Sequence, residues 1–317
     1  MRIKFIINPW AGKGNTQRVS QEVNKFCNEI WRANRTESSI SFTDAQGEES
    51  ARNLARQAAE DKFNRIVFVG GDGLLYEGTN GIMEAYRGKI SSGFAIGIVP
   101  TGTGNNFAKG LKIPKNVRKA LDIIKEDKTI SVDLGKANNR FFVNVISFGF
   151  DARVAEFFQN FREKLQFFPK EGAYLLGVLK EIVSGIQFPQ VRLEGEKINF
   201  ESKVLLVAVT NSPCYGGIFK IAPGAKMQDG MLNICWIEKT GRLRILLNLY
   251  RPIQGTHIYL PEVKMFKASS FTISSPEKLC CEIDGETIEA EKEYKIKTLP
   301  RALRVIVPNF RQYGRKD

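Results

Sequence analysis

Histidine is almost missing from this sequence of 317 residues, and cysteine is scarce. His257 is the one histidine, and the five cysteines form no CxxC pair. A zinc site built from Cys and His is therefore not expected, and neither is a mechanism that uses a His general base. The odd cysteine count, with Cys280 and Cys281 adjacent, also argues against a disulfide framework. Any residue that deprotonates a substrate is expected to be a carboxylate.

Long hydrophobic runs are missing as well. No window of about 18 apolar residues is present that could span a bilayer. The apolar run at 3–8 is too short for a signal peptide and ends at Pro9. Apolar residues make up 43% of the chain and charged residues 26%, which is ordinary for a globular protein with a core of useful size. The sequence thus predicts a soluble protein of the cytoplasm.

Negative charge is in deficit. Lys and Arg number 47 against 34 Asp and Glu, which gives a net charge of +13. Such a surface attracts polyanions, namely nucleic acid, anionic lipid headgroups or nucleotide phosphates. The charges form no block of five or six that would indicate a disordered basic tail. No RNP1, KH-type GXXG or zinc-knuckle pattern occurs, so no nucleic-acid partner is expected.

Buried apolar strands alternate with helices through the first 133 residues. Strands are predicted at 3–8, 39–43, 66–69 and 95–100, with helices at 16–35, 48–60 and 74–87. This alternation is typical of an α/β domain with a parallel sheet. Ligands of such sheets bind beyond the carboxyl ends of the strands, where this sequence places three polar, Gly-rich loops.

Strands become frequent after residue 133, which indicates a second, mainly antiparallel β domain. We expect strands at 141–150, 190–195, 198–202, 203–212, 231–237, 270–275, 280–288, 293–298 and 303–308, and helices at 152–165, 171–186 and 241–251. The last strand is expected to return to the first domain. The predicted domains are therefore 1–133 with 300–317, and 134–299.

The first and third of the Gly-rich loops suit phosphate groups. The first, at 8–14, reads NPWAGKG, and its backbone N–H groups and Lys13 can form an anion site, although no Walker A motif is present. An ordinary strand–helix turn is the alternative interpretation. The third, at 100–107, reads PTGTGNNF, whose hydroxyls and amides suit phosphate or ribose. Trp10 could stack near a nucleotide or serve in packing.

The second loop, Gly70-Gly71-Asp72-Gly73, gives a more specific signal. Its three glycines allow the backbone to approach a phosphate closely. Asp72 would bind a phosphate poorly but could contact Mg²⁺, directly or through water. The alternative is a tight turn with a capping aspartate.

Two later segments supply further carboxylates. Asp284 and Glu286 flank Gly285 and could provide a general base for an alcohol, although Asp-Gly is also a common hairpin turn. A turn-rich element at 216–223 leads to a candidate acid, Asp229.

Seven segments, taken together and in order, resemble the bacterial diacylglycerol kinase and lipid kinase family, which is related to sphingosine kinases. They are NPWAGKG, Thr43, VGGDGLLYEGTNGI, PTGTGNNFAKGL, FFVNVISFGFDA, GGIFKIAPGAKMQDGMLNI and CEIDGE. The resemblance implies a three-layer, Rossmann-like α/β nucleotide domain and a β-sandwich-like domain, with the active site between them. It also implies ATP as co-substrate, Mg²⁺ as cofactor, and transfer of the γ-phosphoryl group to a hydroxyl of a lipid such as diacylglycerol.

The resemblance assigns roles to particular residues. Glu286 stands at the position of the general base, with Asp284 beside it. Asp229 matches an acid that holds Mg²⁺, helped by the carbonyls near Lys226 and Met231, and this ion would reach Asp72 through water. The implied nucleotide site consists of Asn8, Pro9, Trp10, Ala11, Gly12, Lys13, Thr43, Gly70, Gly71, Asp72, Gly73, Glu77, Thr103 and Asn105.

The sequence departs from the family pattern at two positions. Leu74 replaces a threonine after the second loop, which removes a hydroxyl near the phosphates, and Asn106 replaces an aspartate of the carboxylate–water–metal network. These departures leave open a pseudokinase that only binds nucleotide or lipid. A soluble-metabolite kinase of the NAD kinase type also stays open, because such kinases share the GGDG loop.

A soluble lipid kinase must reach its substrate in a bilayer. Aromatic and basic residues interleave at 155–186 and suit a transient contact with the anionic inner face of the membrane. The alternative is an amphipathic helix pair that covers the core of the second domain. The basic region at 242–250 is a second candidate, and a homodimer is compatible with the sequence.

Overall fold

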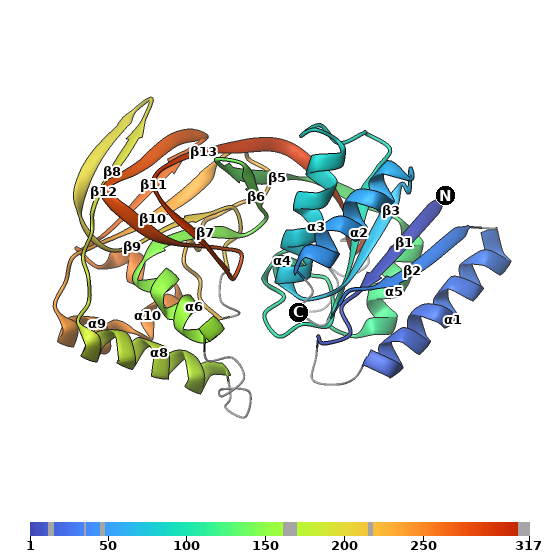
Figure 1. Cartoon of the computed structure of the whole chain (residues 1–317), viewed down its shortest axis with the longest axis horizontal. Coiled ribbons are helices and arrows are strands. Elements are labelled where there is room, and N and C mark those ends of the chain that lie inside the picture. The colour runs from blue at the N-terminus through green and yellow to red at the C-terminus, as the bar shows by residue number, and fades with distance from the viewer. Residues whose placement is uncertain (12–15, 35, 45–47, 161–169, 215–217, 310–317) are drawn as a thin grey trace. The chain divides into compact units, whose positions relative to one another are not determined.

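The computed structural model describes residues 1–11, 16–34, 36–44, 48–160, 170–214 and 218–309. The chain divides into two units, the first made of Met1–Leu134 and Pro300–Asp317 and the second of Gly135–Leu299. For comparison, the sequence predicts these boundaries at 133 and 300. The chain passes from one unit to the other within two strands, β5 and β13 (Figure 1).

The first unit is built on a parallel sheet in the order β13-β4-β3-β1-β2. Its strands are β1 Arg2–Ile7, β2 Glu37–Phe42, β3 Arg65–Gly70, β4 Ala95–Pro100 and the last part of β13 Glu286–Ile306. Its helices are α1 Thr16–Asn34, α2 Glu48–Glu60, α3 Asp72–Ala85, α4 Asn106–Gly110 and α5 Val117–Glu126. The α/β class is confirmed, and so is the return of the last strand, because Val305 pairs in parallel with Ile96.

Helices cover both faces of this sheet (Figure 1). Phe5 on β1 packs edge-to-face against Phe26 of α1, with ring centroids 6.0 Å apart. Phe5 is in register with Val67, so the next residue along β3, Phe68, points to the opposite face, where it lies against Gly78 of α3. The sheet is therefore the middle layer of three, as expected.

The second unit is antiparallel. Its strands are the end of β5 Thr129–Ala137, β6 Arg140–Phe142, β7 Val145–Gly149, β8 Gln190–Gly195, β9 Ile198–Thr210, β10 Leu232–Glu238, β11 Val263–Ala268, β12 Ser270–Ile283 and the first part of β13. The two long strands β9 and β12 each pair with β7 at one part of their length and with β8 at another, so the pairing of these four strands forms a closed ring. Each long strand thus contributes to both layers of a sandwich.

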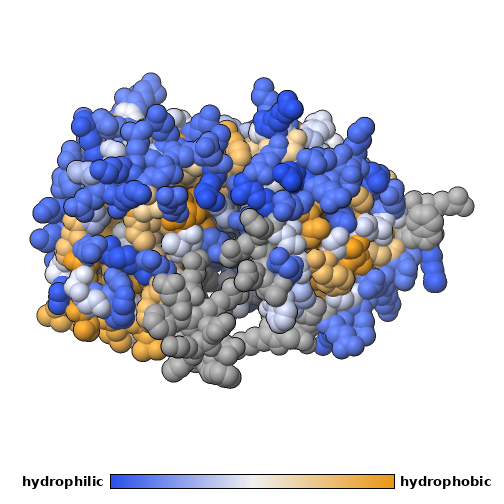
Figure 2. Space-filling view, in the orientation of Figure 1, coloured by the Kyte–Doolittle hydropathy of each residue, from blue (hydrophilic) through white to orange (hydrophobic). Residues whose placement is uncertain are grey.

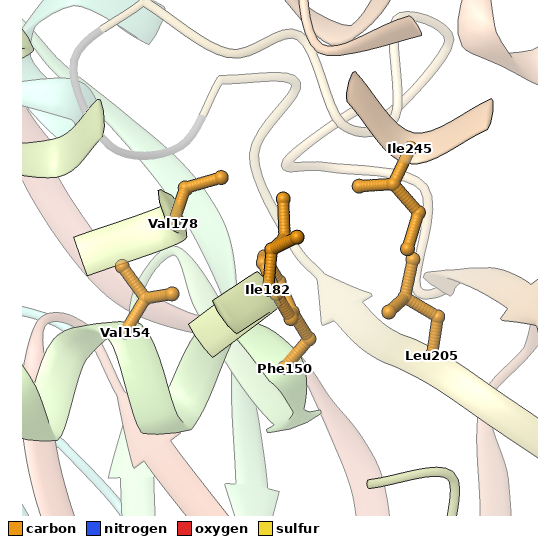
Figure 3. Close-up of a cluster of buried hydrophobic side chains, with 6 residues drawn as sticks. All are labelled: Phe150, Val154, Val178, Ile182, Leu205 and Ile245. Carbon is orange, nitrogen blue, oxygen red and sulfur yellow. The ribbon is translucent and has the colours of Figure 1, made fainter. Parts of the chain in front are cut away.

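Helices line one side of this sandwich and share its core. They are α6 Phe150–Asn160, α8 Lys170–Ser184, α9 Arg242–Asn248, α10 Arg251–Gln254 and the short 3₁₀ helix η1 His257–Tyr259. One buried cluster joins Phe150, Val154, Val178, Ile182 and Ile245 from the helices to Leu205 of β9 (Figure 3). Burial of these side chains fixes α6, α8 and α9 to the strands.

The structure differs from the sequence-based elements in several places. Helices α4 and α5 occupy a stretch where the sequence analysis assigns none, and strands β5 and β11 are also new. Several pairs of expected strands are continuous, since β9 spans 198–202 and most of 203–212. The helix expected at 241–251 is two short helices, because Pro252 cannot continue a helix and begins a new one.

Candidate active site

The carboxyl ends of β2, β1, β3 and β4 are joined by backbone hydrogen bonds. The Thr43 N–H donates to the Ile7 carbonyl at 2.9 Å, and the Asn8 N–H to Val69 at 3.0 Å. The Thr101 N–H donates to the Gly70 carbonyl at 3.0 Å. These bonds bring three predicted loops and Thr43 to one edge of the sheet, where parallel α/β sheets bind ligands.

The first loop begins with a turn stabilised by Asn8, whose side-chain oxygen accepts the Trp10 N–H at 2.9 Å. The Trp10 side chain is 64% exposed, so its interpretation as a packing residue is wrong. Thr43 is buried, and within the described ranges its hydroxyl has no hydrogen-bond partner. A buried hydroxyl without a partner at this edge suits a polar ligand. Pro9 and Ala11 also lie in this turn, whereas Gly12 and Lys13 lie outside the described residues.

The second and third loops approach each other through glycine. A Cβ atom added to Gly102 would lie 2.4 Å from the Cα of Gly71, so the two backbones touch only because both residues lack side chains. Asn105 follows in the left-handed region, with φ 51°, and its side-chain amide donates to the Gly102 carbonyl at 2.6 Å. Thr103, at the tip, is exposed. A small pocket at this contact is lined by Phe68, Gly70, Gly71, Asp72, Leu75, Ile98, Asn105 and Ala108.

The Asp72 carboxylate lies in the first turn of α3 and caps a different helix, α4. It accepts the backbone N–H groups of Asn106 at 2.9 Å and Phe107 at 3.3 Å, and the Asn106 side-chain amide at 3.2 Å. An aspartate at the position of Asn106 would place a second carboxylate against the first, whereas the amide donates to it. Asp72 thus ties the second loop to the third, in addition to any role toward a metal ion.

Two residues next to the second loop have packing and charge roles. Leu74 is buried, and a Cβ atom on Gly70 would lie 2.5 Å from its Cδ2, so the leucine fills the space that the glycine leaves. Glu77 and Glu84 both act on Arg52. The hydrogen bond that the Arg52 guanidinium donates to Glu84 is the main cause of its raised pKa, and the charge of Glu77 adds to this. Leu74 therefore supports the loop from below, whereas the expected threonine would supply a hydroxyl.

The turn between β12 and β13 confirms the interpretation of Asp284-Gly285 as a hairpin turn. Both residues have positive φ, 50° and 101°, and Ile283 pairs with Glu286 across the turn. The buried Asp284 carboxylate accepts the backbone N–H groups of Val143 at 2.7 Å, Asn144 at 2.8 Å and Val145 at 2.9 Å. These bonds fix the turn to the start of β7, so Asp284 acts here as an anchor.

Glu286, the expected base, is the first residue of β13 and is partly exposed. A second carboxylate, Glu282, lies fully buried under the same turn and accepts the Gly285 N–H and, at 2.9 Å, the Ser147 hydroxyl. Ser147 also lies 3.1 Å from Asp151. The sequence analysis assigns no role to Glu282, because nothing local shows that this residue of β12 is buried beneath the turn.

The expected metal ligand Asp229 lies in an exposed turn of the second unit. One carboxylate oxygen accepts the Met231 N–H at 3.1 Å, and the other is ion-paired with Lys267 at 2.7 Å. Lys226 is also exposed in this turn. Carboxylate oxygen is a ligand type that Mg²⁺ takes, but an ion bound at Asp229 would have to displace the Lys267 ammonium from it. No group of three or more His, Cys, Asp and Glu side chains in the described part of the chain could hold a metal ion.

The single histidine lies in the core of the second unit and has a structural role. His257 is 1% exposed, and its Nε2 lies 3.1 Å from the Ile221 carbonyl. Burial lowers its pKa, partly offset by this hydrogen bond, so the neutral ring is favoured. Nearby, burial raises the pKa of the Cys235 thiol to about 12. Both side chains are buried, so neither is accessible to a substrate.

Comparison with known proteins places these features in one family. Residues 2–137 match the family described as the diacylglycerol kinase catalytic domain, and residues 144–307 match the YegS C-terminal NAD kinase beta sandwich-like domain. The chain is 30% identical to a diacylglycerol kinase of Staphylococcus carnosus, over 90% of this chain and 88% of that protein. It is 27% identical to a diacylglycerol kinase of Bacillus subtilis, over 90% and 89% of the two chains. A crystal structure of a diacylglycerol kinase from Bacillus anthracis has the same fold, with a TM-score of 0.76 at 24% identity over 97% of both chains.

Proposed function

This chain belongs to the diacylglycerol kinase family, and from that we propose that it transfers the γ-phosphoryl group of ATP to the hydroxyl of diacylglycerol or a similar lipid alcohol. One observation carries the proposal: the loops that follow β1, β3 and β4 begin at one edge of the first unit, with Gly71 against Gly102. Backbone N–H groups at such an edge suit the phosphates of a nucleotide.

We propose that the triphosphate lies along this edge. The turn at Asn8, the loop from Gly70 to Gly73 and Thr103 would hold the phosphates through N–H groups and hydroxyls. The buried Thr43 hydroxyl and the exposed Trp10 ring lie on the β1–β2 side, where ribose or base would find a polar and an aromatic partner. Asp72 of the first unit and Asp229 of the second are each proposed as a carboxylate contact for Mg²⁺, which when bound would neutralise negative charge on the phosphates.

Glu286 is the proposed general base. Its carboxylate would take the proton of the lipid hydroxyl, whose oxygen forms a bond to the γ-phosphorus while the bond to the β–γ bridging oxygen breaks and ADP leaves. Asp284 supports this role as a positioning residue, because its three N–H partners hold the turn that precedes Glu286.

The first prediction concerns this base. Glu286→Gln removes the proton acceptor but keeps the shape of the side chain, so turnover is expected to fall by about 10²–10⁴. Nucleotide affinity, measured by calorimetry, should stay near the wild-type value because the first unit is untouched. Glu289→Gln, an exchange of the same chemistry further along β13, serves as the control.

The substrate is tested by incubating the protein with labelled ATP and Mg²⁺ over a panel of lipid alcohols and with NAD, and separating the products by chromatography. Labelled phosphatidic acid from diacylglycerol supports the proposal. Label in NAD alone would instead indicate a soluble-metabolite kinase, and nucleotide binding without any product would indicate a pseudokinase.

We further propose that the protein works in the cytoplasm and meets its lipid at an anionic membrane surface. Its net charge of +13 favours such a surface. Across the described residues, no helix is long and apolar enough to cross a bilayer.

A further inference from the structure

Helices α8 and α9 of the second unit lie side by side on one core. Val178 and Ile182 of α8 and Ile245 of α9 point into the same buried cluster (Figure 3). A Cβ atom added to Gly185, just after α8, would lie 3.8 Å from the guanidinium of Arg242, the first residue of α9. The apolar side chains on the inward faces of the two helices are therefore already buried in the core of the second unit.

Their outward faces are apolar as well. On α8, Leu176, Leu179 and Val183 recur at a spacing of three and four and share one face, and Val183 is 81% exposed. On α9, Leu243 and Leu247 are 69% and 64% exposed. Figure 2 shows hydrophobic residues gathered at the lower left of this face of the molecule, where Figure 1 places α8 and α9. Exposed apolar side chains that gather on neighbouring helices in this way mark an interaction surface.

The charge around these side chains identifies the occupant. The stretch 239–254 contains four cations, Lys239, Arg242, Arg244 and Arg251, and no Asp or Glu. Arg244 is paired with Glu262, at 2.7 Å, but the exposed Arg242 and Lys239 add positive charge at the edge of the apolar faces. Two exposed tyrosines, Tyr250 and Tyr259, follow α9 in the sequence. Surfaces that insert at a membrane interface are typically rich in leucine, tyrosine and arginine and poor in Asp and Glu.

A second copy of this chain is a poorer occupant. In a symmetric dimer the same surface meets itself, so Arg242 and Lys239 would face their own copies and repel. An anionic bilayer offers apolar chains to the leucines and phosphates to the cations. We therefore infer that Leu176, Leu179, Val183, Leu243, Leu247 and Ile253, called here the α8–α9 surface, dock the protein on anionic membranes. The surface would deliver the lipid for the proposed function, on which this part of the inference rests.

The test compares two single substitutions that each add one negative charge to an exposed apolar position of the second unit. Leu247→Asp places it on the α8–α9 surface, and Met265→Asp places it on β11. Sedimentation with vesicles of phosphatidylcholine and phosphatidylglycerol in equal parts should show binding weakened about tenfold or more by Leu247→Asp. Met265→Asp should bind as the wild type does, and wild-type binding should fall with added salt and in pure phosphatidylcholine. Circular dichroism checks that both variants fold.

Activity separates this inference from the proposed function. With a short-chain diacylglycerol dissolved as monomers, Leu247→Asp should turn over as fast as the wild type, while its activity on vesicles falls with binding. A wild type that phosphorylates neither substrate would overturn the proposed function, and the sedimentation result would still decide the docking surface. Equal vesicle binding by both variants and the wild type would overturn the inference. A wild-type dimer that Leu247→Asp converts to a monomer, with vesicle binding unchanged, would also overturn it and assign the surface to self-association.

Discussion

At the scale of single residues, two carboxylates near the proposed site, Asp72 and Asp284, are bound to backbone N–H groups. Asp72 accepts two N–H groups at the start of α4, and Asp284 accepts three at the start of β7. Carboxylates that accept several N–H groups hold their loops more firmly than neutral side chains do. Both residues therefore organise the loops beside which the proposed chemistry takes place, and their replacement would affect structure as well as activity.

His257 gives a prediction about pH. Because burial lowers its pKa in the folded state, the unfolded chain binds the proton first as the pH falls. The contribution to stability is complete above the unfolded value of about 6.5 and is lost as the pH falls from there through the lower folded pKa. The free energy of unfolding, measured with urea, should decline with falling pH across this range, by at most about 1.4 kcal/mol per pH unit.

The control for this prediction is His257→Gln, which keeps a donor for the Ile221 carbonyl but does not titrate. Its free energy of unfolding should be lower than the wild-type value at neutral pH and should change less between neutral pH and the onset of carboxylate titration. An equal slope in both proteins would show that other groups cause the pH dependence.

At the scale of elements, the decisive feature is the contact between the loop after β3 and the loop after β4. Backbone atoms of Gly71 and Gly102 meet there, and Asp72 and Asn105 hold the two loops from either side. A phosphate site made of backbone N–H groups depends on this spacing. A side chain added at this contact would collide with backbone atoms, which cannot move aside as the end of a flexible side chain can.

Gly102→Ala tests this contact. The new methyl group would meet the backbone of Gly71 at 2.4 Å, so the loops must separate. We expect a loss of about 1–3 kcal/mol in unfolding free energy, as for other overpacked sites, and an ATP affinity at least tenfold weaker by calorimetry. Gly93→Ala is the matched control, because nothing lies within 4 Å of its added Cβ atom. Comparable losses from both alanines would refute the importance of the contact.

At the scale of the whole molecule, the first unit is discontinuous in sequence. Its β4 is buried along its full length and pairs with β13, whose Leu303, Val305 and Ile306 are buried. Each of these side chains stabilises the fold by about 1.5–3 kcal/mol on burial. Their sum is comparable with the total stability of a domain, about 5–15 kcal/mol. The C-terminal strand is thus needed for the nucleotide unit to fold.

This discontinuity predicts the behaviour of fragments. A fragment of residues 1–134 lacks the partner strand of β4 and is expected to aggregate or stay unfolded, as judged by circular dichroism and gel filtration. The same fragment joined by a Gly/Ser linker to residues 300–309 restores the strand and should fold and bind ATP. Cooperative unfolding of the shorter fragment at the temperature of the linked one would contradict this account.

The sequence alone predicted the α/β class and the antiparallel second domain, because both rest on local patterns, and it offered the Asp284-Gly285 hairpin as one of two interpretations. The return of the last strand was predicted from the tendency of chain ends to lie together. Alternating burial and turn residues are visible along the chain. The helix α5 could also have been predicted, since Asn116 precedes an amphipathic run and accepts the Lys119 N–H at 3.0 Å.

Only the tertiary structure decided which groups meet. Helix α4 is one turn long and starts where Asp72, more than thirty residues earlier, accepts its N–H groups, so nothing local specifies it. Likewise, the sequence shows carboxylates at 282, 284 and 286 but not which are buried and bonded to the backbone. Local patterns determine the elements because neighbouring residues share a strand or a helix. Long-range hydrogen bonds and burial determine the site, because they depend on segments that only folding brings together.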